Sequence, residues 1–480
     1  MRTIENINGE LNGIVWGPVM LVFFIFVGLL FTVRTGFFQV TRFGLWMRST
    51  FLAIFRHRHI RKTDDRHAIS QFQSLCTALA ATVGTGNIVG VATAIALGGP
   101  GAVFWMWLSA FLGMMTNFAE NALGIKYRFK NDKGEWVGGA MHYIERGLKV
   151  KWLAVVFSVF CMLASFGIGN MSQGNSIADG IQGAFFSNFS EVYLFGGVTV
   201  VKAAVAVVIM IFVALVIIGG IKRIASVTEK IVPFMVLLYL IGGLIIILSN
   251  IGNVGYAFKL IFGEAFKFRS AAGGFTGYGI ALAMRRGISR GVFSNEAGLG
   301  SSVMVHSASD VKEPIMQGMW GVFEVFADTI VVCTVTALSI LASGVFSLEG
   351  HLAAISASGA DLPSAMTGIG LTQEAFKTVF GSFGAPFVSV AVLLFAFSTI
   401  LGWSYYGERA WTYLFGGGST AVYKVIFILV IFFGCTSGLS LVWDISDTFN
   451  GLMAVPNLIA ITLLSGQVVK MTKDYLRTKG

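Results

Sequence analysis

Charged side chains are scarce in this sequence. Asp, Glu, Lys and Arg make up 12% of its 480 residues, whereas 55% of the residues are hydrophobic. A water-soluble protein with so few charges could not cover its surface with polar groups. The apolar residues gather in long runs, most of which suffice to cross roughly 30 Å of hydrocarbon. We therefore expect lipid, rather than water, to surround most of the fold.

Cysteines and the common catalytic motifs are equally sparse. The four cysteines, Cys76, Cys161, Cys333 and Cys435, lie in apolar stretches without CxxC spacing, which argues against a disulfide framework or a zinc site. The sequence has no glycine-rich phosphate loop of the nucleotide-binding type, no HExxH motif and no GxSxG motif. ATP hydrolysis and the commoner membrane-hydrolase reactions thus lack support, and we expect neither an enzyme nor a cofactor.

The basic residues are placed as in a membrane protein. The formal net charge is +10, and eight basic residues stand between Arg34 and Arg66 against only Asp64 and Asp65. Such a loop is cytoplasmic under the positive-inside rule, which disfavours nucleic-acid binding and places the N-terminus outside and the C-terminus in the cytoplasm. Lys259 and Lys267 depart from this pattern, and we interpret their segment as an amphipathic surface helix.

Counting the apolar runs predicts eleven transmembrane helices. The first is expected at 14–33, and an amphipathic stretch at 37–55 is expected on the inner membrane surface. The ten further spans are expected at 70–97, 102–125, 152–172, 200–220, 230–250, 272–290, 316–343, 385–406, 420–436 and 448–469.

These ten spans divide into five plus five, and the odd number in each half inverts the second half relative to the first. The predicted fold is therefore an all-α polytopic membrane protein with one extra N-terminal helix and an inverted-repeat core. Its predicted regions are 1–66 for the N-terminal helix and surface segment, 67–250 for the first repeat and 251–480 for the second repeat.

The first span of each predicted half is interrupted by glycine. The interruptions are Ala81-Thr-Val-Gly-Thr-Gly-Asn-Ile-Val-Gly90 and Ala272-Gly-Gly-Phe-Thr-Gly-Tyr-Gly279. Glycine costs about 1 kcal/mol relative to alanine inside a helix, so these clusters favour unwound backbone. Unwound backbone at membrane depth exposes amides to a substrate carboxylate and carbonyls to a cation. The alternative is that the glycines only allow close helix packing.

Hydroxyls and amides within other spans form a second group of candidates. Ser398 and Thr399 could offer hard oxygen ligands to a small cation, and Trp403 shares a helix face with Thr399 and could wall a pocket. A Ser-Thr pair also commonly bonds its own helix backbone. Asn170 and Gln173, three residues apart, could face the same cavity, or could instead belong to a loop at the outer mouth.

Acidic residues inside spans are functional suspects. Glu120 and Glu408 are expected at the cytoplasmic interface, paired with Arg or Lys, whereas Asp328 and Glu324 lie deeper. The middle of the span at 230–250 contains no lysine whose amine could replace a bound sodium ion. This absence favours sodium over protons as the coupling ion.

The motifs resemble the alanine or glycine:cation symporter family, within the superfamily that uses the leucine-transporter fold. Three stretches carry the resemblance: Gly84-Thr-Gly-Asn-Ile-Val-Gly90 with the following Gly98-Gly-Pro-Gly101, Phe293-Ser-Asn-Glu-Ala-Gly-Leu-Gly-Ser-Ser302, and Phe397-Ser-Thr-Ile-Leu-Gly-Trp403. It implies a leucine-transporter-like core and uptake of alanine or glycine by sodium symport, with alternating access, across a bacterial inner membrane. Proton coupling or a preference for serine is the alternative.

The resemblance also implies site residues. The substrate carboxylate and amine would be held around Thr85, Gly86 and Asn87 and around Gly274 and Phe275, with Thr399, Trp403, Gln173 and Asn170 completing the pocket. Sodium would sit between backbone carbonyls near Thr82 to Thr85 and the hydroxyls of Ser398 and Thr399. The stretch from Gly291 to Ser302 is interpreted either as part of an inner gate or as a structural turn with Asn295 as a cap.

Overall fold

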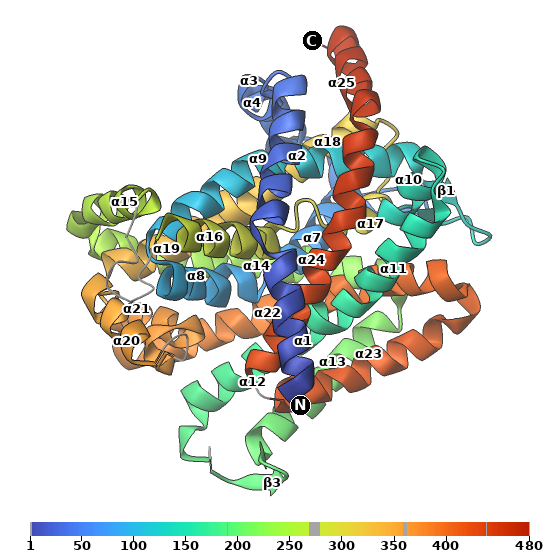
Figure 1. Ribbon diagram of the computed structural model, residues 1–480. Coiled ribbons are helices and arrows are strands. Elements are labelled where there is room, and N and C mark those ends of the chain that lie inside the picture. Colours follow the sequence, from blue (N-terminus) through green and yellow to red (C-terminus); the bar gives the residue numbers. More distant parts are fainter. Residues whose placement is uncertain (1, 190, 268–278, 359–361, 438, 480) are drawn as a thin grey trace.

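The computed structural model describes residues 2–189, 191–267, 279–358, 362–437 and 439–479. Its secondary structure is almost entirely helical, with two short antiparallel hairpins outside the long helices. One pairs β1 (Phe129–Lys130) with β2 (Trp136–Val137), and the other pairs β3 (Tyr193–Phe195) with β4 (Val198–Thr199). The two chain ends lie at opposite ends of the molecule (Figure 1).

The N-terminal region forms one long helical unit followed by short helices. The long unit is α1 (Arg2–Val15) with α2 (Pro18–Arg34), in which Pro18 occupies the first helical turn and needs no backbone partner. The short helices are α3 (Phe38–Thr41), α4 (Phe43–Ser49), α5 (Phe51–Arg56) and α6 (Arg58–Arg61). In Figure 1, α3 and α4 lie at the same end of the molecule as the C-terminus.

The predicted first repeat contains a broken helix, four further spans and their connections. The elements are α7 (Gln71–Thr82), η1 (Gly86–Gly90), α8 (Val91–Gly98), α9 (Gly101–Tyr127), α10 (Ala140–Gly147), α11 (Lys151–Phe166), η2 (Gly167–Met171), α12 (Ser172–Phe185), η3 (Ser187–Phe189), α13 (Val200–Ile217) and α14 (Gly220–Ser249). A capping box starts α7, because the Ser70 hydroxyl accepts from the N–H of Gln73 while the Gln73 side chain accepts from the N–H of Ser70.

The predicted second repeat, 251–480, begins with helix α15 (Ile251–Ala265). Its further elements are α16 (Ile280–Asn295), α17 (Val303–His306), α18 (Pro314–Val325), η4 (Phe326–Cys333), α19 (Thr334–Ala342), α20 (Leu348–Ser358), η5 (Ser364–Met366), α21 (Gly368–Phe380), η6 (Gly381–Phe383), α22 (Gly384–Phe415), η7 (Gly417–Ser419), α23 (Thr420–Thr436), α24 (Leu439–Leu463) and α25 (Ser465–Lys479). The sequence-based interpretation of a surface helix around Lys259 coincides with α15.

Among the described residues, eight helices are long and apolar enough to cross a membrane, or up to ten if each bent helix pair is one span. The bent pairs are Gln71–Thr82 with Gly86–Gly98, at 48°, and Ser446–Leu463 with Ser465–Thr478, at 57°. These segments coincide with ten of the eleven predicted spans. The remaining prediction, at 272–290, falls partly on residues outside the described ranges, and α16 continues five residues past its predicted end.

Small residues let α9 lie close to its neighbours at the centre of the fold. A methyl group on Gly321 of α18 would lie 2.5 Å from the amide of Asn121, and one on Gly287 of α16 would collide with the carbonyl of Ala102. Such contacts replace the hydrophobic driving force that lipid does not supply between helices. They hold both α16 and α18 closely against α9, which positions the polar side chains described next.

Candidate functional site

The backbone of the first broken helix is open between α7 and η1. The helix bends by 48° across Val83, Gly84 and Thr85, all of which are buried. The side chain of Asn87 compensates in part, since its Oδ1 accepts a hydrogen bond of 2.9 Å from the N–H of Gly84. The predicted break at this position is therefore confirmed, and side chains rather than the helix bond the N–H groups of Gly84 and Thr85 there.

A second open stretch follows α16. Glu296 has a left-handed backbone with φ of 57°, and Gly298 and Gly300 have φ of 93° and 72°, conformations that favour glycine. This stretch coincides with the motif that was interpreted as an inner gate or a structural turn. Gly274 and Phe275, the predicted contacts of the second half, lie outside the described residues.

The last turn of α16 meets the first break near Gly86. A methyl group on Gly86 would lie 3.1 Å from the Cα of Ser294 and 3.2 Å from a ring carbon of Phe293, so the two chains are in close contact. Sequence reasoning missed Phe293 and Ser294 as neighbours of the first break. The signal that could have found them was the dense run of glycine and small polar residues from Ser294 to Ser302.

The hydroxyls of α22 face the end of α7. Ser398 and Thr399 both donate to the carbonyl of Ala80, at 3.3 and 3.0 Å, and both also bond the carbonyl of Phe395 in their own helix. The helix-backbone interpretation of this pair is thus confirmed, and the same two hydroxyls also reach the carbonyl of Ala80. The hydroxyl of Thr82 instead bonds Ala78 in its own helix, at 3.2 Å.

Gln173 reaches the first break from the third predicted core span. Its Oε1 accepts from the N–H of Thr85 at 3.3 Å, and its Nε2 donates to the carbonyl of Ile168 at 2.9 Å. Asn170 turns elsewhere, because its amide donates to the carbonyl of Phe427 in α23. The structure therefore brings Gln173, but not the Asn170 amide nitrogen, to the break.

Trp403 closes one side of this region. Its indole N–H donates to Oε1 of Glu296 at 2.7 Å, and its side chain packs directly on the backbone of Gly169. Trp403 and Glu296 are both buried. Sequence reasoning did not assign a partner to Trp403, because Glu296 lies beyond the predicted span at 272–290 and was considered only as part of the stretch from Gly291 to Ser302.

Asp328 lies directly against the first break. Its Oδ1 accepts from the amide of Asn87 at 2.7 Å, and its Oδ2 accepts from the hydroxyls of Ser294 and Thr329 at 2.8 and 2.7 Å. The amide of Asn295 continues this network to Thr329 at 3.0 Å. Asp328 thus ties the first broken helix to α16 and η4 through a fully buried carboxyl group.

Glu408 and Glu120, both expected to pair with basic residues, differ in outcome. Glu408 lies 3.2 Å from Arg409 and 3.3 Å from Lys424, so its predicted pairing with basic residues is confirmed. The same prediction for Glu120 is wrong, because the Oε1 of this buried residue accepts from the N–H of Gly300 and from Asn457. The backbone N–H of Gly300 and the neutral side-chain amide of Asn457 thus supply the hydrogen bonds of the buried Glu120 carboxyl, in place of a basic side chain.

The oxygen atoms near Ala80 have the chemistry that a hard cation requires. The carbonyls of Ala80 and Phe395 and the hydroxyls of Ser398 and Thr399 lie within mutual hydrogen-bond reach, and hard cations prefer such neutral or anionic oxygens. Within the described ranges there is no group of three or more His, Cys, Asp or Glu side chains that could hold a metal ion. These oxygens therefore fit a weakly held monovalent cation rather than a resident transition metal.

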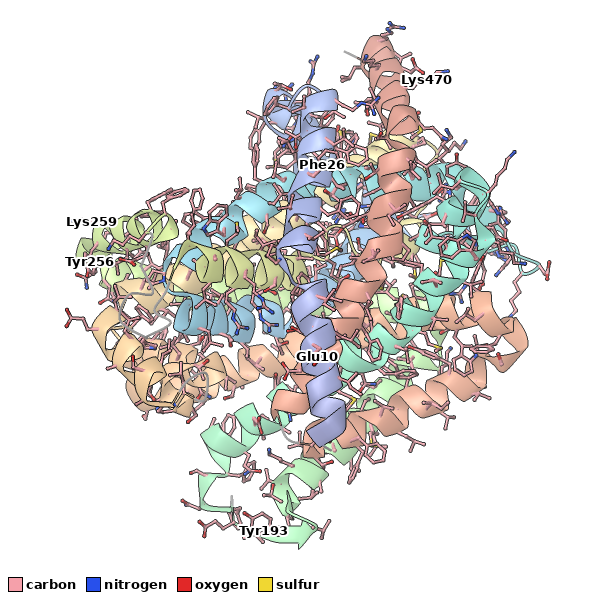
Figure 2. The ribbon with its side chains drawn as sticks, viewed as in Figure 1. Glu10, Phe26, Tyr193, Tyr256, Lys259 and Lys470 are labelled. Atoms are coloured by element: carbon pink, nitrogen blue, oxygen red, sulfur yellow. The ribbon has the colours of Figure 1, made fainter. Side chains whose placement is uncertain are left out.

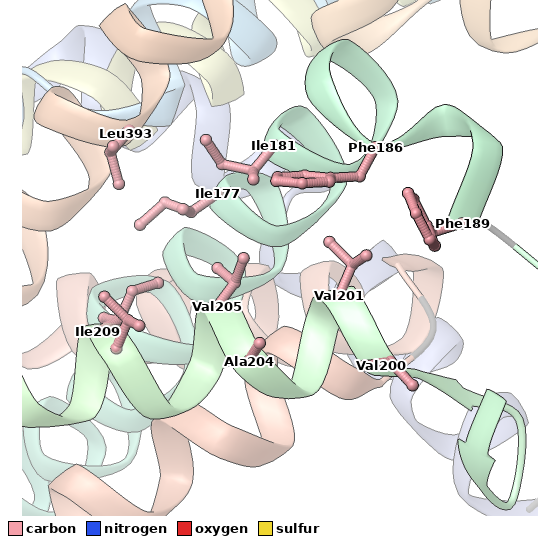
Figure 3. Close-up of a pocket in the computed structure, with 11 residues that line it drawn as sticks. Ile177, Ile181, Phe186, Phe189, Val200, Val201, Ala204, Val205, Ile209 and Leu393 are labelled. Atoms are coloured by element: carbon pink, nitrogen blue, oxygen red, sulfur yellow. The ribbon is translucent and has the colours of Figure 1, made fainter. Parts of the chain in front are cut away.

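Two cavities lie outside this buried region. One of about 420 Å³ is lined by Val89 together with polar residues of α12, α13 and α21, where Asp179 and Lys202 form an ion pair of 2.5 Å. The other, of about 520 Å³, is lined by aliphatic and aromatic side chains such as Ile181, Phe186 and Leu393 (Figure 3). The apolar cavity of about 520 Å³ offers no polar partner to a charged amino acid. The cavity of about 420 Å³ approaches the broken helix through Val89.

Helices interrupted at membrane depth and surrounded by buried amides, hydroxyls and carboxyls define a membrane transporter rather than an enzyme or a lipid-embedded scaffold. The sequence profile of the sodium:alanine symporter family matches residues 1–480, and the chain belongs to this family. It is therefore a multi-pass membrane transporter of the symporter type, as its sequence motifs indicate.

Individual relatives cover almost the whole chain. The sodium/alanine symporter AgcS of Methanococcus maripaludis is 44% identical over 97% of this chain and 95% of the relative. Two Bacillus subtilis proteins are each 36% identical: a probable sodium/glutamine symporter, GlnT, covering 100% of this chain and 92% of its own length, and a putative sodium/proton-dependent alanine carrier protein, YrbD, covering 98% and 92%.

The fold is also similar to a solved membrane transporter. A crystal structure of a manganese transporter from Eremococcus coleocola aligns with a TM-score of 0.52 at 13% identity, covering 86% of this chain and 81% of the other. At this identity the likeness concerns the fold alone.

Proposed function

We propose that the protein imports alanine or glycine together with sodium, by alternating access, across the inner membrane of a bacterium. The observation that carries the proposal is the open backbone at Gly84 and Thr85, held between Gln173, Thr399 and the Asn87–Asp328 pair. The name of the AgcS relative, a sodium/alanine symporter, supports the same substrate and ion.

The substrate carboxylate is assigned to the N–H groups around Thr85, Gly86 and Asn87, where the helix N-terminus at η1 favours negative charge. The hydroxyl of Thr85 is buried and has no hydrogen-bond partner among the described residues, so it is available to the same group. Gln173 orients the N–H of Thr85. The predicted contacts at Gly274 and Phe275 remain part of the proposal, and Asn170 contributes through its side-chain oxygen, which also has no partner within the described part.

The bulk of Trp403 sets the size limit. The indole ring is buried, and its hydrogen bond to Glu296 fixes its orientation. Phe293, beside Gly86, adds a second ring to the same region. A methyl or hydrogen side chain fits between such walls, whereas each larger group must displace an aromatic ring that is packed to interior density.

Sodium is assigned to the carbonyls of Ala80 and of the backbone from Thr82 to Thr85 and to the hydroxyls of Ser398 and Thr399. These hydroxyls bond the carbonyl of Ala80, and they would turn their lone pairs to sodium when it binds. Sodium and the substrate carboxylate then lower each other's desolvation cost inside the membrane, which couples their binding. One positive charge moving down 100 mV contributes about 2.3 kcal/mol.

The proposed architecture is a leucine-transporter-like core of two inverted five-helix repeats, 67–250 and 251–480, after the N-terminal region 1–66. The N-terminus is assigned to the outside and the C-terminus to the cytoplasm. Figure 2 shows Lys470 near the end of the molecule where the C-terminus, α3 and α4 also lie in Figure 1, and Tyr193 near the opposite end. This placement agrees with the positive-inside rule.

The second candidate is a carrier that is coupled to protons or prefers serine. The name of the YrbD relative, a putative sodium/proton-dependent alanine carrier protein, favours proton coupling but not serine. The test is uptake of radiolabelled alanine into proteoliposomes under an inward sodium gradient or an inward proton gradient. Sodium-driven accumulation that excess alanine or glycine inhibits at least tenfold better than serine or glutamine is the expected result. Accumulation under the proton gradient alone, or stronger inhibition by glutamine, contradicts the proposal.

A further inference from the structure

A buried histidine–glutamate pair lies outside the site just described. Nε2 of His306, at the end of α17, is 2.9 Å from Oε2 of Glu324 in α18, and neither side chain is exposed. The amide of Asn117 in α9 donates to the same Oε2 at 3.2 Å. On the other ring nitrogen, Nδ1 of His306 faces the side chains of Gln317 and Ser74, the latter at 3.3 Å. The proposed transport site uses none of these groups.

The surroundings of His306 accommodate either one or two ring protons. With the side-chain N–H of Gln317 directed at Nδ1, the imidazole is neutral and donates from Nε2 to Glu324, while Oε1 of Gln317 has no partner among the described residues. Turning the Gln317 amide by half a rotation exchanges its nitrogen and oxygen without moving any other atom. Oε1 then accepts from a protonated Nδ1, and the imidazolium uses both N–H groups.

Other acidic groups surround the pair. The titratable groups that interact electrostatically with Glu324 from other elements are Glu120 of α9, Glu296 after α16, Asp328 of η4 and Tyr406 of α22. The three carboxyls are held by neutral donors, chiefly Asn457, Trp403 and Asn87. A negative charge on any one of these carboxyls is costly in a low-dielectric interior, and a bound cation relieves that cost.

The pair is linked to the transport site through one helical turn. Asp328 follows Glu324 by four residues, so the two carboxyls lie on neighbouring turns of one continuous helix. Asp328 holds Asn87, and Asn87 holds the N–H of Gly84 beside Thr399. A change of charge at His306 and Glu324 therefore reaches the place assigned to sodium through a short, fully buried chain of contacts.

We infer that His306 and Glu324 form a proton-binding site, and that a proton bound there and a cation at Ser398 and Thr399 oppose each other. When the pair holds the extra proton it is neutral overall, and when it releases the proton it carries one negative charge. The negative state strengthens cation binding at the transport site, and the neutral state weakens it. This second half of the inference rests on the proposed sodium site, whereas the first half does not.

The proton is tested first, without reference to sodium. The chain contains six histidines, so the NMR signals of nitrogen-15-labelled His306 are identified by their loss in His306→Gln. Spectra are recorded between about pH 8 and pH 5, the range in which histidine charge commonly changes, and we expect both the one-proton and the two-proton form of His306 to appear. In Glu324→Gln the two-proton form loses the acceptor of its Nε2 proton and is expected to be less populated. A His306 that keeps one form throughout this range overturns the inference.

Sodium binding is then measured at both ends of this pH range, by the fluorescence of the protein in detergent. The dissociation constant for sodium is expected to rise about fivefold or more on acidification, as for a coupling free energy of about 1 kcal/mol or more. Glu324→Gln is expected to abolish the dependence. His351→Gln is the matched control, since His351 is also buried but both of its ring nitrogens face backbone carbonyls, those of Ser347 and Met366.

The outcomes separate this inference from the proposed function. Sodium binding that does not change with pH overturns the opposition between proton and cation while leaving sodium-driven uptake intact. Absence of sodium-dependent uptake at every pH overturns the proposed function, and the NMR titration still decides the proton site. If Glu324→Gln fails to fold, Gln317→Met keeps a similar side-chain length and removes the amide. In that variant His306 is expected to stay in the one-proton form over the whole range, and an unchanged titration contradicts the inference.

Discussion

The indole of Trp403 donates a hydrogen bond of 2.7 Å to the carboxylate of Glu296, across 107 positions of the chain. Trp403 belongs to α22, which carries the hydroxyls of Ser398 and Thr399, and Glu296 belongs to the open stretch after α16. The bond therefore holds the wall of the proposed pocket against the second break. A ring fixed by a buried carboxylate keeps its place when the pocket empties, which preserves the size limit between transport cycles.

Removing the Glu296 carboxylate tests this role. Glu296→Ala deprives both Trp403 and the hydroxyl of Ser301 of their acceptor, and a buried donor left without its acceptor costs about 1–3 kcal/mol. We expect the KM for alanine uptake to rise about tenfold or more. Glu296→Gln keeps an oxygen that can accept from Trp403, so its KM should lie between those of the unchanged protein and Glu296→Ala. Equal KM values in all three proteins would show that the bond does not position the ring.

Added bulk at the first break is expected to block transport. In Gly84→Ala the new methyl group would collide with Oγ1 of Thr399 and lie 3.3 Å from Oε1 of Gln173. Overpacking costs about 1–3 kcal/mol, so alanine uptake should fall about tenfold or more while the protein still folds. Gly252→Ala in α15 is the control, because a methyl group there meets nothing within 4 Å. Similar losses in both variants would point to a general effect of replacing glycine.

Acid pH is expected to destabilise the segment around α10, which lies between two spans. Burial, followed by the positive charges of Arg146 and Arg409, lowers the pKa of His142 to about 4. The unfolded chain takes up this proton near about pH 6.5, so stability is full above that pH and falls as the pH drops towards about 4. The slope is at most about 1.4 kcal/mol per pH unit.

Thermal unfolding in detergent measures this effect. Between about pH 7 and pH 5 the apparent Tm of the unchanged protein should fall more steeply than that of His142→Gln, which has no proton to gain. The exposed His67 provides the control, and His67→Gln should follow the unchanged protein. Parallel curves for the unchanged protein and His142→Gln would mean that His142 is already protonated or is solvated when folded.

Much of the fold could be predicted because lipid imposes a simple rule on sequence. Ten predicted spans coincide with helices or bent pairs, since each had to bury its own backbone polar groups within one apolar run. The break at Gly84 was predictable for a related reason, because glycine beside Thr85 and Asn87 disfavours helix locally. Local composition thus fixes where helices run and where one of them opens.

Partners far apart in sequence could not be predicted in the same way. The bond between Asn87 and Asp328 spans 241 positions, and nothing local distinguishes Asp328 from an acid that merely faces a neighbouring helix. Glu120 was expected to meet a cation, yet packing brings it the N–H of Gly300. The role of the stretch from Glu296 to Gly300 stayed open for the same reason, because its neighbours come from α22 and α9.

The hydroxyl of Thr399 offers the most direct test of sodium symport at this site. Thr399→Val keeps the shape of the side chain and removes the oxygen that faces Ala80, whereas Thr399→Ser keeps the oxygen. The measurement is the initial rate of alanine uptake into proteoliposomes as a function of external sodium. The account predicts sodium-driven uptake for the unchanged protein and for Thr399→Ser, and loss of sodium stimulation in Thr399→Val. Sodium-stimulated uptake by Thr399→Val with an unchanged sodium requirement would contradict it.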